Sequence, residues 1–181
     1  MSNNPKPPRR VVIGNNKDGK SVVISDSDNP YQYNRGGGST IYFNEIWTID
    51  KCPVDLSNID DGANRPLSHS PPLSGAHFRV IESKKEDNKK INQKAADKFF
   101  ESMNRTGLSE KMKSDKHWNM HRTRTVDYGI VTKGKRIHVL PNDELVMHEG
   151  DVIVQLGHFH SWDNSQGANE MLFIMIGGDN E

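Results

Sequence analysis

The chain has 181 residues, of which 33% are hydrophobic, and its mean hydropathy is −0.80. Lysine plus arginine and aspartate plus glutamate number 24 each, so the formal net charge is zero. A neutral balance argues against nucleic acid or a membrane surface as the main partner, and the length predicts one domain. The polar composition predicts long surface loops around a modest core.

The cysteine content and the absence of long apolar runs predict the compartment. Cys52 is the only cysteine, which excludes an intramolecular disulfide, and we expect it to be a small buried hydrophobic residue in a reducing environment. No apolar run approaches the roughly 18 residues of a membrane span. The polar N-terminus, residues 1–10, is predicted to be disordered and not to be a secretory signal. We therefore expect a cytoplasmic protein.

The N-terminal half is predicted to contain four strands. Alternating or β-branched residues favour strands at 11–13, 21–25, 40–47 and 76–82, the first two joined by a hairpin turn at Asp18-Gly19. Residues 51–75 carry four prolines and are predicted to be mostly loop. The stretch 11–25 is a candidate for reaching a partner subunit in a homodimer.

A single helix is predicted over residues 84–106. Residues 84–103 contain six lysines but no glycine or proline, and Ile91, Ala95 and Phe99 recur at helical spacing. Gly107 is expected to end the helix. The lysines are expected to form its solvated face.

From residue 120 onward the pattern predicts only strands and turns. Strands are expected at 121–132, 136–140, 144–147, 151–155, 160–162 and 171–176, with turn residues between them. Short strands at this spacing are typical of a sandwich or barrel.

Two short motifs in this region contain the candidate metal ligands. The first reads His121-Arg-Thr123, three residues, Asp127, six residues and Gly134. The second begins at Gly150 and continues with Gly157, two residues, His160, three residues and Asn164. Imidazole nitrogens and carboxylate oxygens are the ligands that divalent first-row metals bind.

Together the motifs resemble the two signatures of the cupin superfamily. Residues 120–129 are further similar to a bacterial and fungal subgroup of single-domain cupins. The resemblance implies an all-β jelly-roll barrel, with its core at residues 119–181, and added strands and one surface helix from residues 11–118. The chain departs from the cupin pattern because Thr123 stands where a second histidine is usual and Asp127 where glutamate is usual. The ligand set that remains is His121, Asp127 and His160.

Strand geometry supports part of this set. Side chains two residues apart on an extended strand face the same way, so His121, Thr123, Thr125 and Asp127 are all expected to point inward. Asp127 has a second possible role, as an acceptor that orients an imidazole through its other nitrogen. His158 shares the parity of His160 and is a candidate extra ligand or catalytic acid/base, a role we also assign to Asp127.

Other residues are candidates for substrate contact. These are Thr123, Thr125, Tyr128, Trp162 and His117, with barrel core as the alternative for Tyr128 and Trp162. Arg122 and Arg124 have the opposite parity and are expected to face outward. His138 and His148 are interpreted as surface residues.

The chemistry predicted from these residues requires one divalent ion, Fe, Zn, Mn or Ni. Bound to two imidazoles and a carboxylate, it suits Lewis-acid chemistry on a small oxygen-rich molecule: a lyase, isomerase, cyclase or decarboxylase. The alternatives are an Fe(II)-dependent dioxygenase and a non-catalytic small-molecule-binding cupin with a degenerate metal site. The partners we expect are this substrate and a second copy of the chain.

Overall fold

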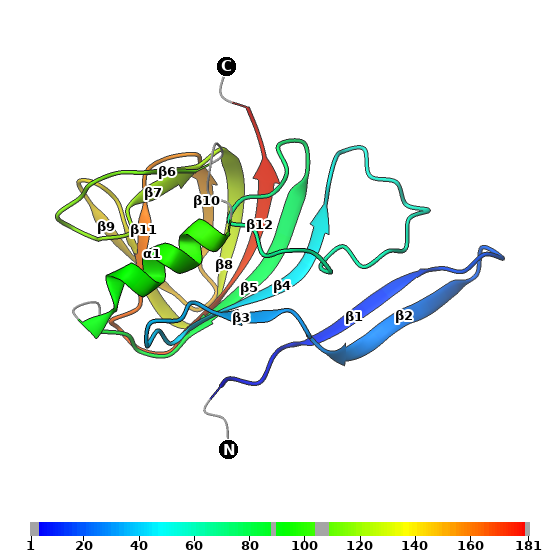
Figure 1. Cartoon of the computed structure of the whole chain (residues 1–181), viewed down its shortest axis with the longest axis horizontal. Coiled ribbons are helices and arrows are strands. Elements are labelled where there is room, and N and C mark those ends of the chain that lie inside the picture. Colours follow the sequence, from blue (N-terminus) through cyan, green and yellow to red (C-terminus); the bar gives the residue numbers. More distant parts are fainter. Residues whose placement is uncertain (1–3, 88–89, 104–108, 180–181) are drawn as a thin grey trace.

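The structure, a computed structural model, describes residues 4–87, 90–103 and 109–179. Its N-terminal half contains β1 (Arg9–Asn15), β2 (Ser21–Asp28), β3 (Gln32–Asn34), β4 (Ile41–Ile49), β5 (Ala76–Ser83) and the helix α1 (Gln93–Ser102). The rest contains β6 (Ser109–Lys111), β7 (His121–Thr123), β8 (Thr125–Val139), β9 (Glu144–His148), β10 (Val152–Leu156), β11 (Ser161–Asp163) and β12 (Asn169–Gly177). The elements and their order along the chain are drawn in Figure 1.

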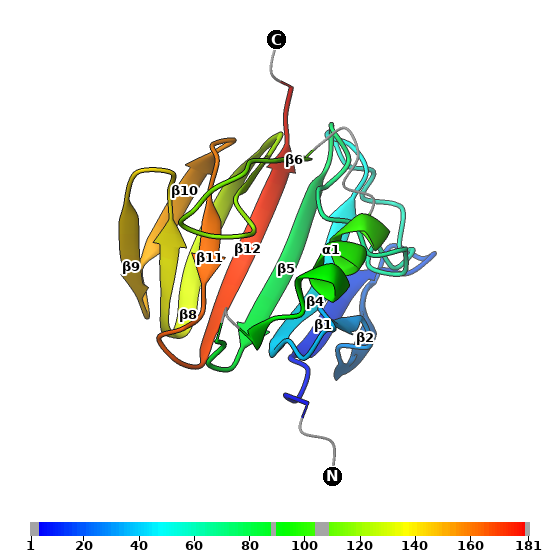
Figure 2. The same ribbon diagram turned by 60° about the vertical axis from the view of Figure 1, so that its left-hand side comes forward.

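The strands form two layers that share β8. The main layer has the order β10-β8-β12-β5-β4-β3, so three N-terminal strands continue the sheet beyond β12, and Figure 2 shows β5 and β4 beside it. Beyond Gly134, β8 leaves β12 and pairs instead with β9 and β11. Gly134 has φ +69°, and a Cβ there would collide with the Ala168 carbonyl, so this change of layer requires glycine.

The second layer closes over the first. A backbone bridge between His121 and His160 joins β7 to the residue that precedes β11, and β7 pairs with β6. The layers enclose an interior with an apolar cluster of Val131, Met147, Met171, Phe173 and Met175. The expected all-β jelly-roll barrel with one helix is confirmed.

The helix α1 is shorter than the expected range of 84–106. It begins after Asn92, whose side chain accepts a hydrogen bond from the Ala95 amide, and it buries Ala96 and Phe100. Residues 84–87 are not helical, because the buried Glu86 carboxylate binds Arg35 at 2.8 Å and Ser39 at 2.8 Å. The expected stop at Gly107 lies outside the described residues.

The hairpin of β1 and β2 projects from the barrel (Figure 1). Arg9 and Arg10 lie in β1 and not in a disordered N-terminus, because Arg9 pairs with Asp26 and Arg10 with Asp61. Cys52 is exposed, contrary to its expected burial, because the loop that holds it lies outside the core. The homodimer through this hairpin stays a prediction. In the described residues, no helix is long and apolar enough to span a membrane.

Candidate functional site

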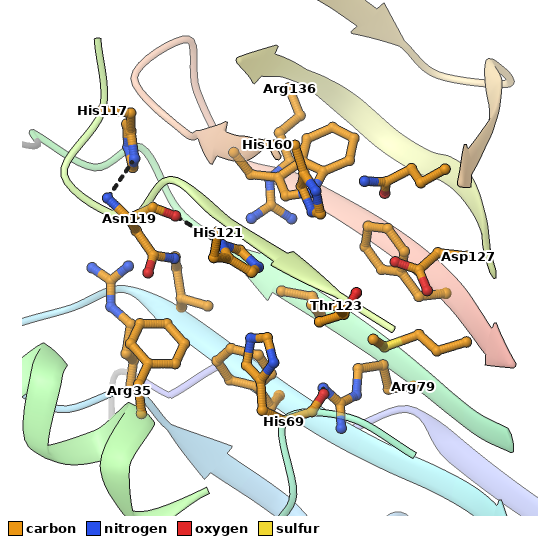
Figure 3. Close-up of a pocket in the computed structure, with 18 residues that line it drawn as sticks. Arg35, His69, Arg79, His117, Asn119, His121, Thr123, Asp127, Arg136 and His160 are labelled. Carbon is orange, nitrogen blue, oxygen red and sulfur yellow. Dashed lines mark hydrogen bonds between the residues drawn. The ribbon is translucent and has the colours of Figure 1, made fainter. Parts of the chain in front are cut away.

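A cavity of about 90 Å³ lies between the two layers, large enough for several water molecules or a small organic molecule. Its lining is mixed, with arginines, histidines and amides facing apolar and aromatic side chains (Figure 3). The polar residues are Arg35, His69, Arg79, His117, Asn119, His121, Thr123, Asp127, Arg136, Gln155 and His160, and the apolar ones include Phe43, Phe100, Trp162 and Phe173.

The first motif is directed into this cavity. His121, Thr123, Thr125 and Asp127 are all buried, as the strand parity predicts, and all but Thr125 line the cavity. The Thr125 hydroxyl instead shares a 2.6 Å hydrogen bond with that of Thr123. Of the other predicted contact residues, His117 and Trp162 line the cavity.

Tyr128 lies neither at the cavity nor in the barrel core, the two places predicted for it. It is 44% exposed, on the outer face of β8, because its parity is opposite to that of Asp127. Arg122 and Arg124, which share this parity, pair with Glu110 and Asp179 as outward-facing residues.

The imidazoles of His121 and His160 lie side by side, with ring centroids 4.7 Å apart. Reciprocal backbone hydrogen bonds of 2.9 and 2.8 Å between the two residues fix this pair. The Nδ1–H of His121 donates to the Asn119 carbonyl at 2.7 Å, and that of His160 donates to the His158 carbonyl at 3.0 Å. Each bond places the lone pair on Nε2, the arrangement found in metal-binding histidines.

His138 is a site residue that the sequence interpretation missed. It is 1% exposed and not a surface residue, because β8 turns inward after Gly134 and directs Arg136 and His138 to the interior. The ligand atoms of His138, His158 and His160 all lie within 4.8 Å of one another. Gln155, which lines the cavity, contacts His138 through its amide at 3.4 Å. These three imidazoles could hold a metal ion.

Burial keeps the histidines of this cluster neutral. It lowers the pKa of His138 to about 3 and that of His160 to about 4, and it also lowers the pKa of His158. Neutral imidazole is the form that binds metals. Burial also raises the pKa of Asp127 to about 6, and its Oδ1 has no hydrogen-bond partner among the described residues. Asp127 can therefore hold or release a proton near neutral pH.

We expect acid to destabilise the fold. The pKa values of His117 (about 4), His138 and His160 all lie below the ordinary 6.5. The stability that these neutral histidines contribute to the fold is therefore fully present above pH 6.5 and is lost as the pH falls toward 4. Asp127 acts in the opposite sense, because its pKa is raised in the folded protein. The stability that it contributes is fully present below pH 3.8 and is lost as the pH rises through 6. Because three histidines act in one direction and one aspartate in the other, we expect the histidines to determine the net change in stability. The urea midpoint should fall steadily from pH 7 to pH 4.5, and a rise would contradict this account.

Two of the lining arginines are in buried ion pairs. Arg35 binds Glu86 at 2.8 Å, and Arg79 binds Glu45 at 3.0 Å. The sequence interpretation did not identify these arginines, or Arg136, as site residues. The alternation of a strand does not reveal that one of its buried faces is polar. The inward parity that Arg136 shares with His138 is the signal that could have found both.

Comparison with known proteins relates the chain to cupins. The chain is 26% identical over 162 residues to the cupin-domain-containing oxidoreductase srdD of Neurospora crassa, a match that covers 87% of this chain and 67% of the relative. It is also 26% identical over 175 residues to the cupin-domain-containing oxidoreductase virC of Hypocrea virens, covering 92% and 74%. No family model matches the chain.

Solved structures give a more distant likeness. The cupin domain of Cnp3 from Schizosaccharomyces pombe aligns with a TM-score of 0.44 and 9% identity, covering 93% of this chain and 87% of that one. The barrel and these two relatives relate the chain to cupin-domain proteins.

Proposed function

We propose that this chain is a metal-dependent cupin enzyme that acts on a small oxygen-rich organic molecule. The observation that carries the proposal is the group of His138, His158 and His160, with ligand atoms within 4.8 Å of one another, beside the cavity. His160 belongs both to this group and to the cavity wall. A metal held here would lie next to the substrate.

The residues present fit a divalent transition metal. Three neutral imidazoles are ligands that Fe, Zn, Mn and Ni accept, and the buried Nδ1 of His138 has no hydrogen-bond partner among the described residues. A metal bound there would supply Lewis-acid or redox chemistry. His121 and Asp127, the other members of the predicted ligand set, would then face the substrate.

Non-redox chemistry is supported by Asp127. Its carboxyl lines the cavity, and a pKa of about 6 matches that of a group that transfers protons at neutral pH. His158 is a half-buried member of the cluster and would serve as a metal ligand, the first of its two predicted roles, and not as the acid/base. An enolisation, dehydration or decarboxylation would use Asp127 to hold the proton.

An Fe(II)-dependent dioxygenase is the second candidate, because the relatives srdD and virC are named oxidoreductases. The two reactions differ in whether dioxygen is consumed. A third candidate, the non-catalytic binding domain, differs from both in having no metal requirement.

The test is metal analysis by mass spectrometry, on protein purified without a metal-affinity tag, followed by oxygen-electrode assays with a panel of small organic acids. We expect near-stoichiometric iron, zinc, manganese or nickel. Turnover with oxygen uptake would select the oxidoreductase, and turnover without uptake would select the non-redox enzyme. No metal as purified and no binding on titration would overturn the proposal and favour the binding domain.

A further inference from the structure

Arg136 is a buried cation without a carboxylate partner. The residue is 4% exposed and lines the cavity, where its guanidinium group lies near the His160 imidazole (Figure 3). Its Nε and Nη1 have no hydrogen-bond partner, and it forms no ion pair among the described residues. The contact that holds it is with the Trp162 ring, whose centroid is 5.2 Å from the guanidinium carbon.

Two carboxylates, Glu86 and Asp163, attract Arg136 at longer range, but neither forms an ion pair with it among the described residues. The other two lining arginines, Arg35 and Arg79, are each bound to a buried glutamate. The remaining lining acid, Asp127, forms no ion pair with Arg136. Arg136 therefore has guanidinium donors at the cavity wall that no described residue satisfies.

Such a charge is costly unless a ligand pairs with it. A buried ion without a partner loses its hydration and gains nothing in return. A guanidinium group keeps its charge in folded proteins at neutral pH, so Arg136 is a cation. Buried donors without partners are uncommon in folded proteins and are expected where a ligand supplies the acceptor.

We propose that Arg136 binds the carboxylate of a small organic acid whose apolar body packs against the aromatic wall of the cavity. Guanidinium and carboxylate form paired, charge-assisted hydrogen bonds, which suit a single buried arginine. Phe43, Phe100 and Phe173 supply the apolar surface for the rest of the molecule. This inference rests on the proposed function, because it names the substrate class of the same cavity.

The test measures binding to chelator-treated protein, so that no metal can hold the carboxylate. Acetate, isobutyrate and benzoate are titrated by calorimetry in a chloride buffer, beside their neutral amides. We expect at least one carboxylate to bind at least tenfold more tightly than its amide. Arg136→Met should weaken this binding at least tenfold, Arg136→Lys should restore part of it, and Arg9→Met on the distant hairpin should have no effect.

Thermal unfolding separates a binding role from a structural one. Because Arg136→Met removes an unpaired buried charge, its unligated melting temperature should equal or exceed that of the wild type, and the bound carboxylate should no longer raise it. Equal binding of acids and amides, no binding of any of the three acids, or unchanged binding by Arg136→Met would each overturn the inference. Metal content is measured separately on untreated protein, so loss of the proposed metal function would not be mistaken for this result.

Discussion

Replacing His160 with alanine is expected to abolish stoichiometric metal binding. His160 is 5% exposed, lies within 4.8 Å of the ligand atoms of His138 and His158, and also contacts the His121 ring. Removing it leaves two imidazoles of the cluster, too few for the three-ligand sites that hold catalytic zinc. Metal content by mass spectrometry should fall from near one ion per chain to a background value.

The matched control for this variant is His148→Ala. His148 lies on β9, and its side chain is 66% exposed, outside the cavity. Its loss should leave the metal content unchanged. Full metal occupancy in His160→Ala, with the fold intact by circular dichroism, would show that the ion is held elsewhere.

The second large effect is expected from Arg79→Ala. The Arg79 guanidinium donates to the Glu45 carboxylate at 3.0 Å and to the Ser68 carbonyl at 2.7 Å, and both charged side chains are buried. Truncation would leave the Glu45 charge buried without its arginine. Loss of one member of a buried pair costs about 3–5 kcal/mol, which urea unfolding at pH 7 would measure.

A surface pair provides the comparison. Arg65 binds Asp50 at 2.7 Å, but the Asp50 side chain is 70% exposed. Arg65→Ala should therefore cost less than about 1 kcal/mol. The double variant Arg79→Met with Glu45→Gln should regain much of the stability, because neither charge is then buried. Similar costs for Arg79→Ala and Arg65→Ala would refute the importance of the buried pair.

Local patterns in the sequence predicted the strands, and the resemblance to cupins predicted the jelly-roll barrel. Alternation of polar and apolar residues located the main strands, and the parity of residues 121–127 correctly placed His121, Thr123 and Asp127 inside the barrel. The helix was predicted too long, because helical spacing cannot reveal that Glu86 is held in a buried ion pair with Arg35.

The site was harder to predict because it depends on contacts between distant strands. His138 and Arg136 follow the bend at Gly134, and their burial arises only when β11 and β7 close over the main sheet. Tyr128 shows the opposite error. It follows Asp127 directly in the sequence, but its side chain faces outward while that of Asp127 faces the cavity. Polar residues facing a barrel interior lack the hydrophobic signal on which sequence patterns depend.

The most direct test of the metal site is a crystal structure of the protein soaked with Zn²⁺ or Co²⁺, with anomalous scattering to locate the ion. The account predicts one strong peak about 2.0–2.2 Å from a nitrogen of each of His138, His158 and His160. A peak bound instead by His121, Asp127 and His160, or the absence of any peak in the barrel, would contradict it.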